Sequence, residues 1–379
     1  MKKTIYRVGV IGKTGHGNYG HHLDIAFHGI TNAEIVSFAD SDEPGLREAG
    51  IRTGAEKLYI DYTDMLEAED LDLVVIGPRW VDCHLEMAVN ASKSNILGIL
   101  MEKPMSKTLS EADMIIDSCE KNGVRLAVAH RRANLYEKYA KKIISDGAIG
   151  QLMTIRGAGK SDHRSGPEDL VVLGTHILDS MRYFAGADVS WSQSSVTSNG
   201  IDVSKKDLFE GGDQIGLIAG DRLDCFYMFN NGVTGHFESY KRNISNGMSP
   251  FGIDLYGTEG IISLRSSPNT EMYIYPNATW FPDKNKGDWE KVSIQDWEIN
   301  SSTGDPFTPE EKMKLSNKMI ASELILAIEE DRDVVDSSSG YDGRAALEMI
   351  MSVYESQRLR KRVDFPMENR ENPYSLFTD

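Results

Sequence analysis

The segment YRVGVIGKTGHGNYG, residues 6–20, gives the strongest indication of the fold in this sequence. Its first six residues are β-favouring and mostly apolar, which predicts a buried strand. Gly15, Gly17 and Gly20 then match the spacing G-x-G-x-x-G, in which glycines let backbone N–H groups approach a diphosphate at a helix N-terminus. A helical pattern over residues 21–29 and a second strand over residues 34–39 follow, as the match requires. The segment therefore predicts a dinucleotide-binding unit. Its loop is about three residues longer than the usual form, because Gly12 already ends the strand.

An acidic residue closes the second predicted strand. Asp40 lies 20 residues after Gly20, where a carboxylate is expected to accept hydrogen bonds from the adenosine ribose of a dinucleotide. Asp42 and Glu43 follow it, and no basic residue occurs before Arg47. A 2′-phosphate would meet like charges here, so the sequence favours NAD over NADP. The alternative is a solvated acidic turn.

Strands and helices alternate through residues 1–129. Further apolar strands are predicted over residues 71–76, 95–100 and 125–129. This alternation predicts an α/β domain with a Rossmann-type, doubly wound parallel sheet. Such sheets bind ligands at the carboxyl ends of their strands, where the sequence places Pro78, Arg79, His84, Glu102, Lys103 and His130.

Two of these residues have a plainer alternative. His84 could line the crevice at the strand ends, or it could simply lie on the helix predicted over residues 83–92. Pro104 biases Lys103 toward an extended backbone, and a bond into proline can be cis, so we expect the Lys103 ammonium to be held in place. Alternatively, Lys103 is a surface lysine at a turn between a strand and a helix.

The pattern changes in residues 130–379. Helices are predicted over residues 136–146, 170–184, 316–330 and 340–358, and short strands lie between the second and third of them. Asn231-Gly232 between two strands is a strong hairpin signal, so this half is expected to be an α+β domain with a large, mainly antiparallel open sheet. Helices on one face would leave the other face to bury against a second subunit, which predicts a homodimer or homotetramer. Alternatively, that face is polar and solvated.

Bulk composition excludes several classes of protein. The 379 residues suffice for about two domains, and a net charge of −17 disfavours nucleic acid and anionic membranes as partners. Cys83, Cys119 and Cys225 have no disulfide-like or metal-like spacing, which is typical of a reducing compartment. The histidines near the glycines lack a carboxylate or thiolate at ligand spacing, so no metal site is expected. No signal peptide or membrane span is recognisable, and we expect a cytoplasmic protein.

Together these motifs resemble the Gfo/Idh/MocA family, which includes glucose–fructose oxidoreductase and inositol dehydrogenase. The resemblance rests on the glycine loop, Asp40, Pro78 with His84, Glu102-Lys103-Pro104 and His130-Arg131-Arg132. It extends through residues 174–179, 254–260 and 341–348, and so covers nearly the whole chain.

The resemblance implies roles for individual residues. Lys103 and His176 are implied to be catalytic, beside the nicotinamide and the reacting carbinol. The implied cofactor contacts are Gly12, Thr14, Gly15, His16, Gly17, Tyr19, Asp40, Pro78, Arg79, His84, Glu102, Lys103 and His130. The candidate substrate contacts are Arg132, His163, Arg164, Asp169, Thr175 and Asp179.

Two positions depart from the family pattern. Many members carry an aspartate four residues before the catalytic histidine, where this chain has Val172, and an asparagine where this chain has His130. Glu168 and Asp169 lie just upstream of Val172 and offer a carboxylate by another route.

The implied reaction is hydride transfer between a sugar or polyol carbinol and NAD. Burial and the positive nicotinamide would lower the pKa of Lys103 toward neutrality, which would allow it to act as a base. An alternative with the same fold is an enzyme that retains NAD and oxidises a sugar transiently, to enable elimination, epimerisation or glycoside cleavage. A second alternative is a non-catalytic dinucleotide-binding sensor, which would need neither Lys103 nor His176.

Overall fold

The computed structural model describes residues 5–240, 249–266, 270–277 and 287–378. They divide into two compact units. The first comprises the chain up to Ala133, with Gly212–Ile215 and Glu310–Arg344. The second comprises Asn134–Gly211, Gly216–Pro309 and the chain from Ala345. Residues 310–344, which the sequence analysis placed in the second domain, therefore pack with the first unit.

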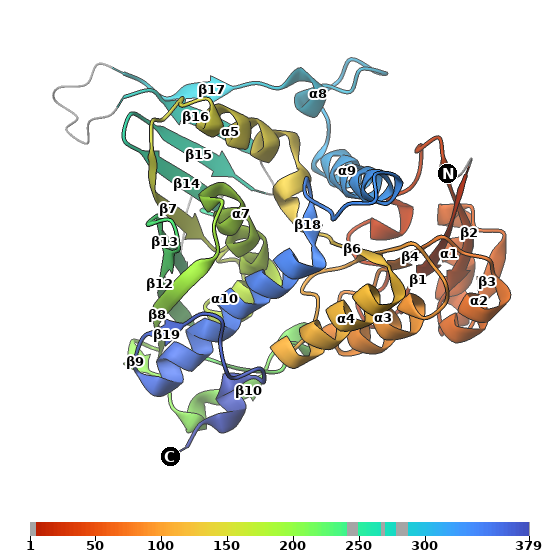
Figure 1. Ribbon diagram of the computed structural model, residues 1–379, viewed down its shortest axis with the longest axis horizontal. Helices are drawn as coiled ribbons and strands as arrows, with labels where there is room; N and C mark the ends of the chain where they lie inside the picture. Colours follow the sequence, from red (N-terminus) through yellow and green to blue (C-terminus); the bar gives the residue numbers. More distant parts are fainter. Residues whose placement is uncertain (1–4, 241–248, 267–269, 278–286, 379) are drawn as a thin grey trace. The chain divides into compact units, whose positions relative to one another are not determined.

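The first unit is built on a seven-stranded sheet in the order β18-β6-β5-β4-β1-β2-β3 (Figure 1). Its strands are β1 (Tyr6–Ile11), β2 (Ala33–Ala39), β3 (Lys57–Tyr59), β4 (Leu73–Ile76), β5 (Gly98–Met101), β6 (Arg125–Val128) and β18 (Ser338–Ser339). Strands β1 to β6 pair in parallel, and β18 adds an antiparallel edge to β6. The strand order reverses between β1 and β4, so the predicted doubly wound sheet is confirmed.

Helices cover this sheet. They are α1 (Glu43–Thr53), α2 (Tyr62–Ala68), α3 (His84–Ser92), α4 (Leu109–Asn122) and α9 (Pro309–Glu329), with short 3₁₀ turns η1 (Leu23–Ile25), η2 (Val81–Cys83), η3 (Arg131–Ala133) and η6 (Gly212–Gln214). Helices α3 and α4 lie side by side (Figure 1). Leu46 of α1 and Leu324 of α9 share one hydrophobic core with Val8 and Val10 of β1. Burial of this apolar face explains why residues 310–344 belong to the first unit.

Helix α4 forms for reasons visible in its sequence. The Thr108 side chain caps its N-terminus by accepting a hydrogen bond from the Glu111 N–H, and Gly123 ends it in a left-handed conformation. Its buried stripe is Ala112, Ile115, Ile116 and Cys119, as the helical spacing predicts.

The prediction of a helix over residues 21–29 is wrong. Only the 3₁₀ turn η1 forms there, and its neighbours are turns closed by bonds of the i→i−3 type, as from His28 N–H to the Ile25 carbonyl. His22 and Gly29 have positive φ values of 62° and 71°, which an α-helix does not contain. The glycine loop is therefore not followed by an α-helix.

The second unit is built on a ten-stranded sheet in the order β17-β16-β15-β14-β7-β13-β12-β8-β19, with β9 paired to β8. Its strands are β7 (Leu152–Ala158), β8 (Val189–Ser198), β9 (Ile201–Asp202), β12 (Arg222–Phe229), β13 (Thr234–Tyr240), β14 (Gly252–Gly257), β15 (Ile261–Arg265), β16 (Glu271–Tyr275), β17 (Glu290–Val292) and β19 (Val363–Asp364). Strands β10 (Leu208–Glu210) and β11 (Leu217–Ala219) form a separate pair. Only the β7–β13 pairing is parallel among these described strands, and Asn231-Gly232 joins β12 and β13 as a hairpin, so the mainly antiparallel sheet is confirmed.

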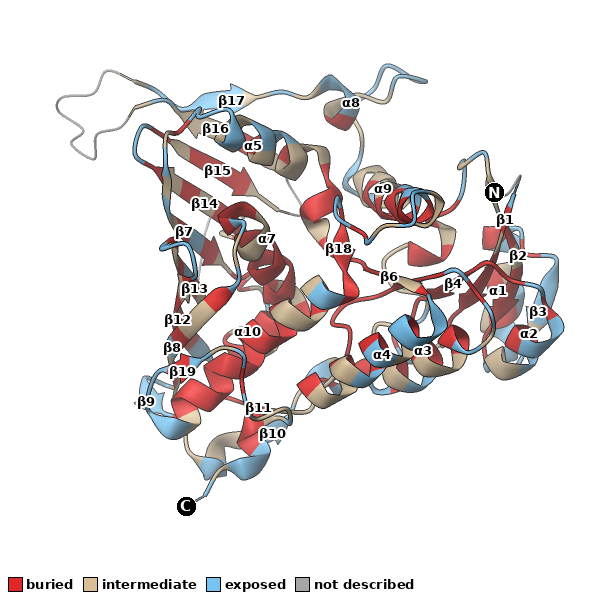
Figure 2. Cartoon of the chain, viewed as in Figure 1, coloured by how far each residue is buried: buried red, intermediate tan, exposed pale blue. Residues whose placement is uncertain are grey.

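Helices cover one face of this large sheet (Figure 1). The helical segments of the unit are α5 (Leu135–Ser145), α6 (Pro167–Asp169), the π-helical turn η4 (Leu170–Gly174), α7 (Thr175–Ala185), η5 (Lys205–Asp207), α8 (Gln295–Glu298) and η8 (Pro373–Leu376). Helix α10 (Gly340–Leu359) begins in the first unit and continues in the second, where most of its length is buried (Figure 2). The Tyr227 hydroxyl of β12 donates to the Met349 carbonyl of α10 at 3.0 Å, so α10 is pinned to the sheet.

Candidate active site

The glycine loop of the first unit is a closed hairpin. Lys13 and Asn18 pair through two backbone hydrogen bonds, and the Asn18 side chain accepts a third from the Gly15 N–H. Gly15, Gly17 and Gly20 have φ values of 82°, 86° and 74°, which favour glycine. A Cβ on Gly17 would lie 2.4 Å from the Arg79 backbone nitrogen, so the loop also approaches the end of β4 too closely for any other residue.

Asp40, at the end of β2, binds this loop. Its carboxylate accepts hydrogen bonds from the Thr14 hydroxyl at 2.7 Å, from the Thr14 N–H at 3.0 Å and from the Asp42 N–H at 3.0 Å. Asp40 is only 3% exposed. The carboxylate that was predicted to receive the adenosine ribose therefore holds the glycine loop against β2, and a direct ribose contact stays a prediction.

Glu102, which follows β5, binds the end of the same loop. Its carboxylate accepts hydrogen bonds from the His21 N–H at 3.1 Å and from the Lys103 N–H at 3.0 Å. Burial alone would raise the pKa of Glu102, but the His21 hydrogen bond and the Lys103 ammonium outweigh it and hold that pKa well below its usual range. Glu102 is thus a buried carboxylate anion that joins the glycine loop to the lysine.

Lys103 is buried at the carboxyl end of the parallel sheet, with 5% of its surface exposed. The Lys103–Pro104 peptide bond is cis. The sequence analysis expected a lysine held in place rather than a mobile surface residue, and the burial of Lys103 excludes the surface alternative. Its catalytic role stays a prediction.

His84 is fully buried and connects the segments that follow β4 and β5. Its Nε2 lies 2.7 Å from the Pro78 carbonyl oxygen and its Nδ1 lies 3.0 Å from the Pro104 carbonyl oxygen. Burial lowers the pKa of His84, against the attraction of the Pro78 carbonyl. The residue lies at the start of α3, so the plainer of its two sequence interpretations describes its position, and it acts by joining the segments that carry Arg79 and Lys103.

Aromatic and cationic side chains surround the loop. The His16 ring contacts the Trp80 ring edge-on, with 4.6 Å between centroids. The Arg52 guanidinium lies over the Tyr19 ring at 3.6 Å from its centroid. The Arg79 Nε is buried and has no hydrogen-bond acceptor among the described residues. The loop is thus fixed by packing, and Arg79 carries an uncompensated buried donor beside Gly17.

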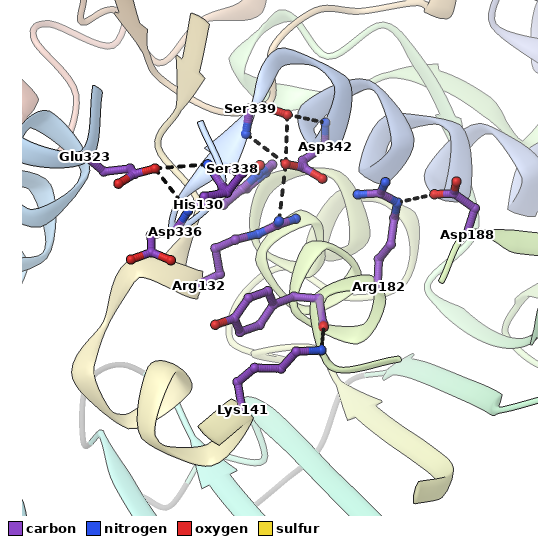
Figure 3. Close-up of polar contacts among 12 residues, drawn as sticks. His130, Arg132, Lys141, Arg182, Asp188, Glu323, Asp336, Ser338, Ser339 and Asp342 are labelled. Atoms are coloured by element: carbon purple, nitrogen blue, oxygen red, sulfur yellow. Dashed lines mark hydrogen bonds and ion pairs between the residues drawn. The ribbon is translucent and has the colours of Figure 1, made fainter. Parts of the chain in front are cut away.

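His130 and Arg132 follow β6 and bond to residues near β18 (Figure 3). The His130 Nδ1 lies 2.9 Å from the Ser338 hydroxyl. The Arg132 guanidinium forms an ion pair of 3.2 Å with Asp342, which also accepts hydrogen bonds from Ser339. These contacts bind the end of β6 to the start of α10. Sequence reasoning missed Ser338 and Asp342 as partners, although Asp342 lies in the family-like segment 341–348.

His176, Thr175 and Asp179 lie together on the first turns of α7 in the second unit, directly after the π-helical turn η4. They are 4%, 2% and 0% exposed. The structure therefore buries all three predicted residues on one helix. Single π-helical turns occur frequently at functional sites.

Asp169, which offered another route to the carboxylate that this chain lacks at Val172, accepts hydrogen bonds from its own loop and from β13. It is 0% exposed and accepts hydrogen bonds from the Ser239 hydroxyl at 2.6 Å and from the Ser161 N–H at 3.1 Å. Burial raises the pKa of Asp169, and the Ser239 hydrogen bond only partly opposes this. Asp169 thus attaches the start of the loop over residues 160–166 to β13. Its contact with substrate stays a prediction, and Ser239 was not found by sequence reasoning.

The same loop carries the other predicted substrate contacts. The Arg164 guanidinium bonds both carboxylate oxygens of Asp162, at 2.9 and 3.2 Å. Burial opposes ionisation of Asp162, but the side chain and N–H of Arg164 hold the pKa of that carboxyl well below its usual range. The His163 side chain is 80% exposed. Arg164 therefore orders the loop, whereas His163 projects from it.

The first unit fits a dinucleotide. Its glycine loop approaches the β4 end where a Cβ would collide, and a buried arginine nitrogen beside it lacks an acceptor. Within the described part of the chain, no group of three or more His, Cys, Asp or Glu residues could hold a metal ion. The helices among the described residues include none that is both long and apolar enough to cross a membrane.

Comparison with known proteins agrees with this geometry. The family described as "Oxidoreductase family, NAD-binding Rossmann fold" matches residues 6–130. D-apiose dehydrogenase of Paraburkholderia graminis is 35% identical over 177 residues, which are 44% of this chain and 46% of that protein. Levoglucosan dehydrogenase of Pseudarthrobacter phenanthrenivorans is 26% identical over 256 residues, which are 60% of this chain and 64% of that protein. The matches thus span less than two thirds of these relatives' own length.

Solved structures share the fold over almost the whole chain. A levoglucosan dehydrogenase in complex with NADH and L-sorbose superposes with a TM-score of 0.75 at 22% sequence identity. The superposition covers 96% of this chain and 100% of that chain. Both units therefore have counterparts of the same architecture.

Proposed function

Because residues 6–130 belong to the Gfo/Idh/MocA oxidoreductase family, whose Rossmann domain binds NAD, we propose that this chain is an NAD-dependent dehydrogenase of a sugar or polyol. The observation that carries the proposal is the position of Lys103. It is buried at the carboxyl end of the parallel sheet, next to a carboxylate that binds the glycine loop. The names of the relatives, which include D-apiose and levoglucosan dehydrogenases, support a carbohydrate substrate.

NAD, when bound, supplies the hydride acceptor for oxidation of a carbinol carbon. The part of this chain is to hold the reactants and to move a proton. We assign Lys103 as the base that removes the proton from the reacting hydroxyl. Glu102 positions Lys103 through the hydrogen bond between its carboxylate and the Lys103 N–H. His176 is assigned as the second group that handles this proton, on the strength of the family resemblance.

The remaining predicted contacts define where selectivity would arise. We propose that His163, which projects from its loop, together with Thr175 and Asp179, selects the substrate hydroxyls. Asp169, Arg164 and Arg132 remain proposed substrate contacts, and their bonds to Ser239, Asp162 and Asp342 would also fix the segments that carry them. His130 and His84 are assigned the same supporting role near the cofactor.

The test is a panel of aldoses, anhydrosugars, inositols and sugar acids offered with NAD⁺ and with NADP⁺. We expect stoichiometric NADH formation with at least one carbohydrate and a clear preference for NAD⁺. No turnover with any member of the panel would contradict the proposal. Cofactor that copurifies and is not reduced in net terms would instead indicate transient oxidation of the substrate.

We also propose that the chain self-associates through the open face of the large sheet. Phe226 lies there with its ring centroid 5.1 Å from those of Trp191 and of His236. Aromatic clusters of this kind are enriched at protein interfaces. Sedimentation is expected to detect a dimer or tetramer, and Phe226→Asp is expected to shift it toward monomer. A wild-type monomer at micromolar concentration would reject the proposal.

The three cysteines are free and buried, which supports the proposal of a cytoplasmic location.

A further inference from the structure

Most backbone N–H groups of the glycine loop, which would ordinarily bind a diphosphate, already donate hydrogen bonds within the protein. Hydrogen bonds within the protein engage the N–H groups of Gly12, Lys13, Thr14, Gly15, His16, Asn18, Gly20 and His21. Among the described loop residues from Gly12 to His21, only the N–H groups of Gly17 and Tyr19 have no such bond. A closed loop of this kind offers a diphosphate few free donors.

The second usual source of stabilisation is also missing. In Rossmann domains, the diphosphate lies at the N-terminus of the helix that follows the glycine loop, where the helix dipole and free N–H groups favour negative charge. Here the 3₁₀ turn η1 (Leu23–Ile25) takes the place of that helix, and the Glu102 carboxylate already accepts the His21 N–H at 3.1 Å. We therefore expect another positively charged group to compensate the two negative charges of the diphosphate.

We infer that Arg79, assisted by Lys13, is the diphosphate-binding group of this protein. The Arg79 backbone nitrogen and Cβ lie 2.4 and 2.8 Å from the position of a Cβ on Gly17, so Arg79 starts directly against the loop. Its Nε is buried without an acceptor among the described residues, which is costly unless a ligand supplies one. A guanidinium also matches phosphate oxygens with two parallel hydrogen bonds.

Lys13 follows the strand next to the one that Arg79 follows. Ile11 of β1 pairs with Ile76 of β4 in parallel, so Lys13 and Arg79 come two and three residues after paired positions. No ion pair engages the Lys13 ammonium within the described part of the chain. The His16–Trp80 contact, with ring centroids 4.6 Å apart, holds the loop and the segment after β4 together. The two cationic residues thus follow neighbouring parallel strands at one edge of the sheet.

The inference rests on dinucleotide binding by the first unit and not on sugar oxidation, so it is tested by binding alone. Isothermal titration calorimetry would measure the Kd of NAD⁺, ADP and adenosine for the wild-type chain, Arg79→Gln, Arg79→Lys and Lys13→Gln. Arg79→Gln is expected to weaken ADP and NAD⁺ by about tenfold to a hundredfold, the range of a hydrogen bond to a charged group. Adenosine, which has no phosphate, should bind all variants within about twofold of the wild type, because its binding involves no hydrogen bond between Arg79 and a phosphate.

The other variants and the salt dependence sharpen the result. Arg79→Lys retains the positive charge but not the paired N–H donors of a guanidinium, so its Kd for ADP should lie between those of the wild type and Arg79→Gln. Lys13→Gln should lose less affinity for ADP than Arg79→Gln. The dependence of log Kd on log salt should be shallower in Arg79→Gln, because one charge–charge contact is gone. Lys121→Gln is the matched control, since it removes one exposed positive charge near the C-terminus of α4.

Two outcomes would overturn the inference. One is that Arg79→Gln binds ADP as tightly as the wild type. The other is that it loses adenosine affinity in the same proportion as ADP affinity, which would place Arg79 in the support of the pocket. Circular dichroism establishes whether Arg79→Gln is folded. If it is not, Arg79→Lys decides by the same two comparisons. Absence of sugar turnover would leave these binding results unaffected, so failure of the proposed function and failure of this inference can be distinguished.

Discussion

The Glu102 carboxylate accepts a hydrogen bond from the His21 N–H at 3.1 Å, across 81 positions of sequence. The same carboxylate accepts the N–H of Lys103, the next residue. One buried anion thus joins the glycine loop to the lysine assigned as the base. A change at Glu102 is therefore expected to disturb cofactor binding and catalysis together.

The first prediction concerns Glu102→Gln. The neutral amide retains the shape but presents its NH₂ group to one of two N–H donors, so we expect a loss of about 1–3 kcal/mol in the free energy of unfolding. Because the folded-state pKa of Glu102 is lowered, its stabilisation is present above the unfolded-state pKa of about 4.3 and is lost as the pH falls toward the folded value. Urea denaturation between neutral and acid pH should therefore show a shallower acid decline in the variant. A decline identical to that of the wild type would contradict the lowered pKa.

The second prediction concerns Asp169→Asn, where the sign is opposite. Burial raises the folded-state pKa of Asp169, so this residue makes the folded state less stable as the pH rises from the unfolded-state pKa toward the raised folded value. The variant lacks this contribution, and its stability relative to the wild type should increase over that range. The amide oxygen of the variant can accept from both the Ser239 hydroxyl and the Ser161 N–H, which share Oδ2 in the wild type. Its NH₂ group then meets the Lys160 N–H, which bonds Oδ1 at 3.3 Å, so its absolute stability at acid pH should be lower. Denaturation curves at several pH values, compared with those of Glu102→Gln, check both signs.

The third prediction concerns Thr14→Val, which keeps the shape and removes the hydroxyl that donates to Asp40 at 2.7 Å. A hydrogen bond to a charged group is worth about 1.5–3 kcal/mol, so we expect the loop to loosen and NAD⁺ affinity to fall by about tenfold or more. The Michaelis constant for the carbohydrate should change little. Thr63→Val is the control, because the Thr63 hydroxyl donates to the Asp61 carboxylate at the same 2.7 Å at an exposed helix start. Equal NAD⁺ affinity of Thr14→Val and the wild type would exclude the role of this contact.

The fourth prediction concerns Lys103→Ala. Loss of a general base is expected to lower turnover by a factor of about 10²–10⁴ or more, while NAD⁺ binding is mostly retained. Single-turnover kinetics and calorimetry separate the two effects. Lys93→Ala, at the exposed end of α3, is the matched control and should keep full turnover. A Lys103→Ala variant with wild-type turnover would remove the assignment of the base.

Much of the architecture is encoded locally. The apolar run Tyr6–Ile11, the glycines after it and the Asn231-Gly232 turn were each recognisable, because backbone conformation there depends on the residues themselves. The buried stripe of α4 followed from its spacing. The sequence predicted a Lys103 held in place by Pro104, and the structure shows that Lys103 is buried.

Other features were decided by residues far apart in the chain. The helix expected after the glycine loop does not form, and the His21 N–H that would have begun it is bound by Glu102. Asp40 accepts a hydrogen bond from Thr14, and Asp169 accepts one from Ser239. No local sequence pattern predicts these bonds.

The parallel sheet, the hairpin and the residues at strand ends could be predicted from the sequence, since they depend on side-chain periodicity and on the φ values that glycine and asparagine allow. Which buried carboxylate binds which loop, and the return of residues 310–344 to the first unit, became visible only in the folded chain. The physical reason is that a buried polar group must find a partner, and an apolar helix face must find a core, wherever the folded chain provides them.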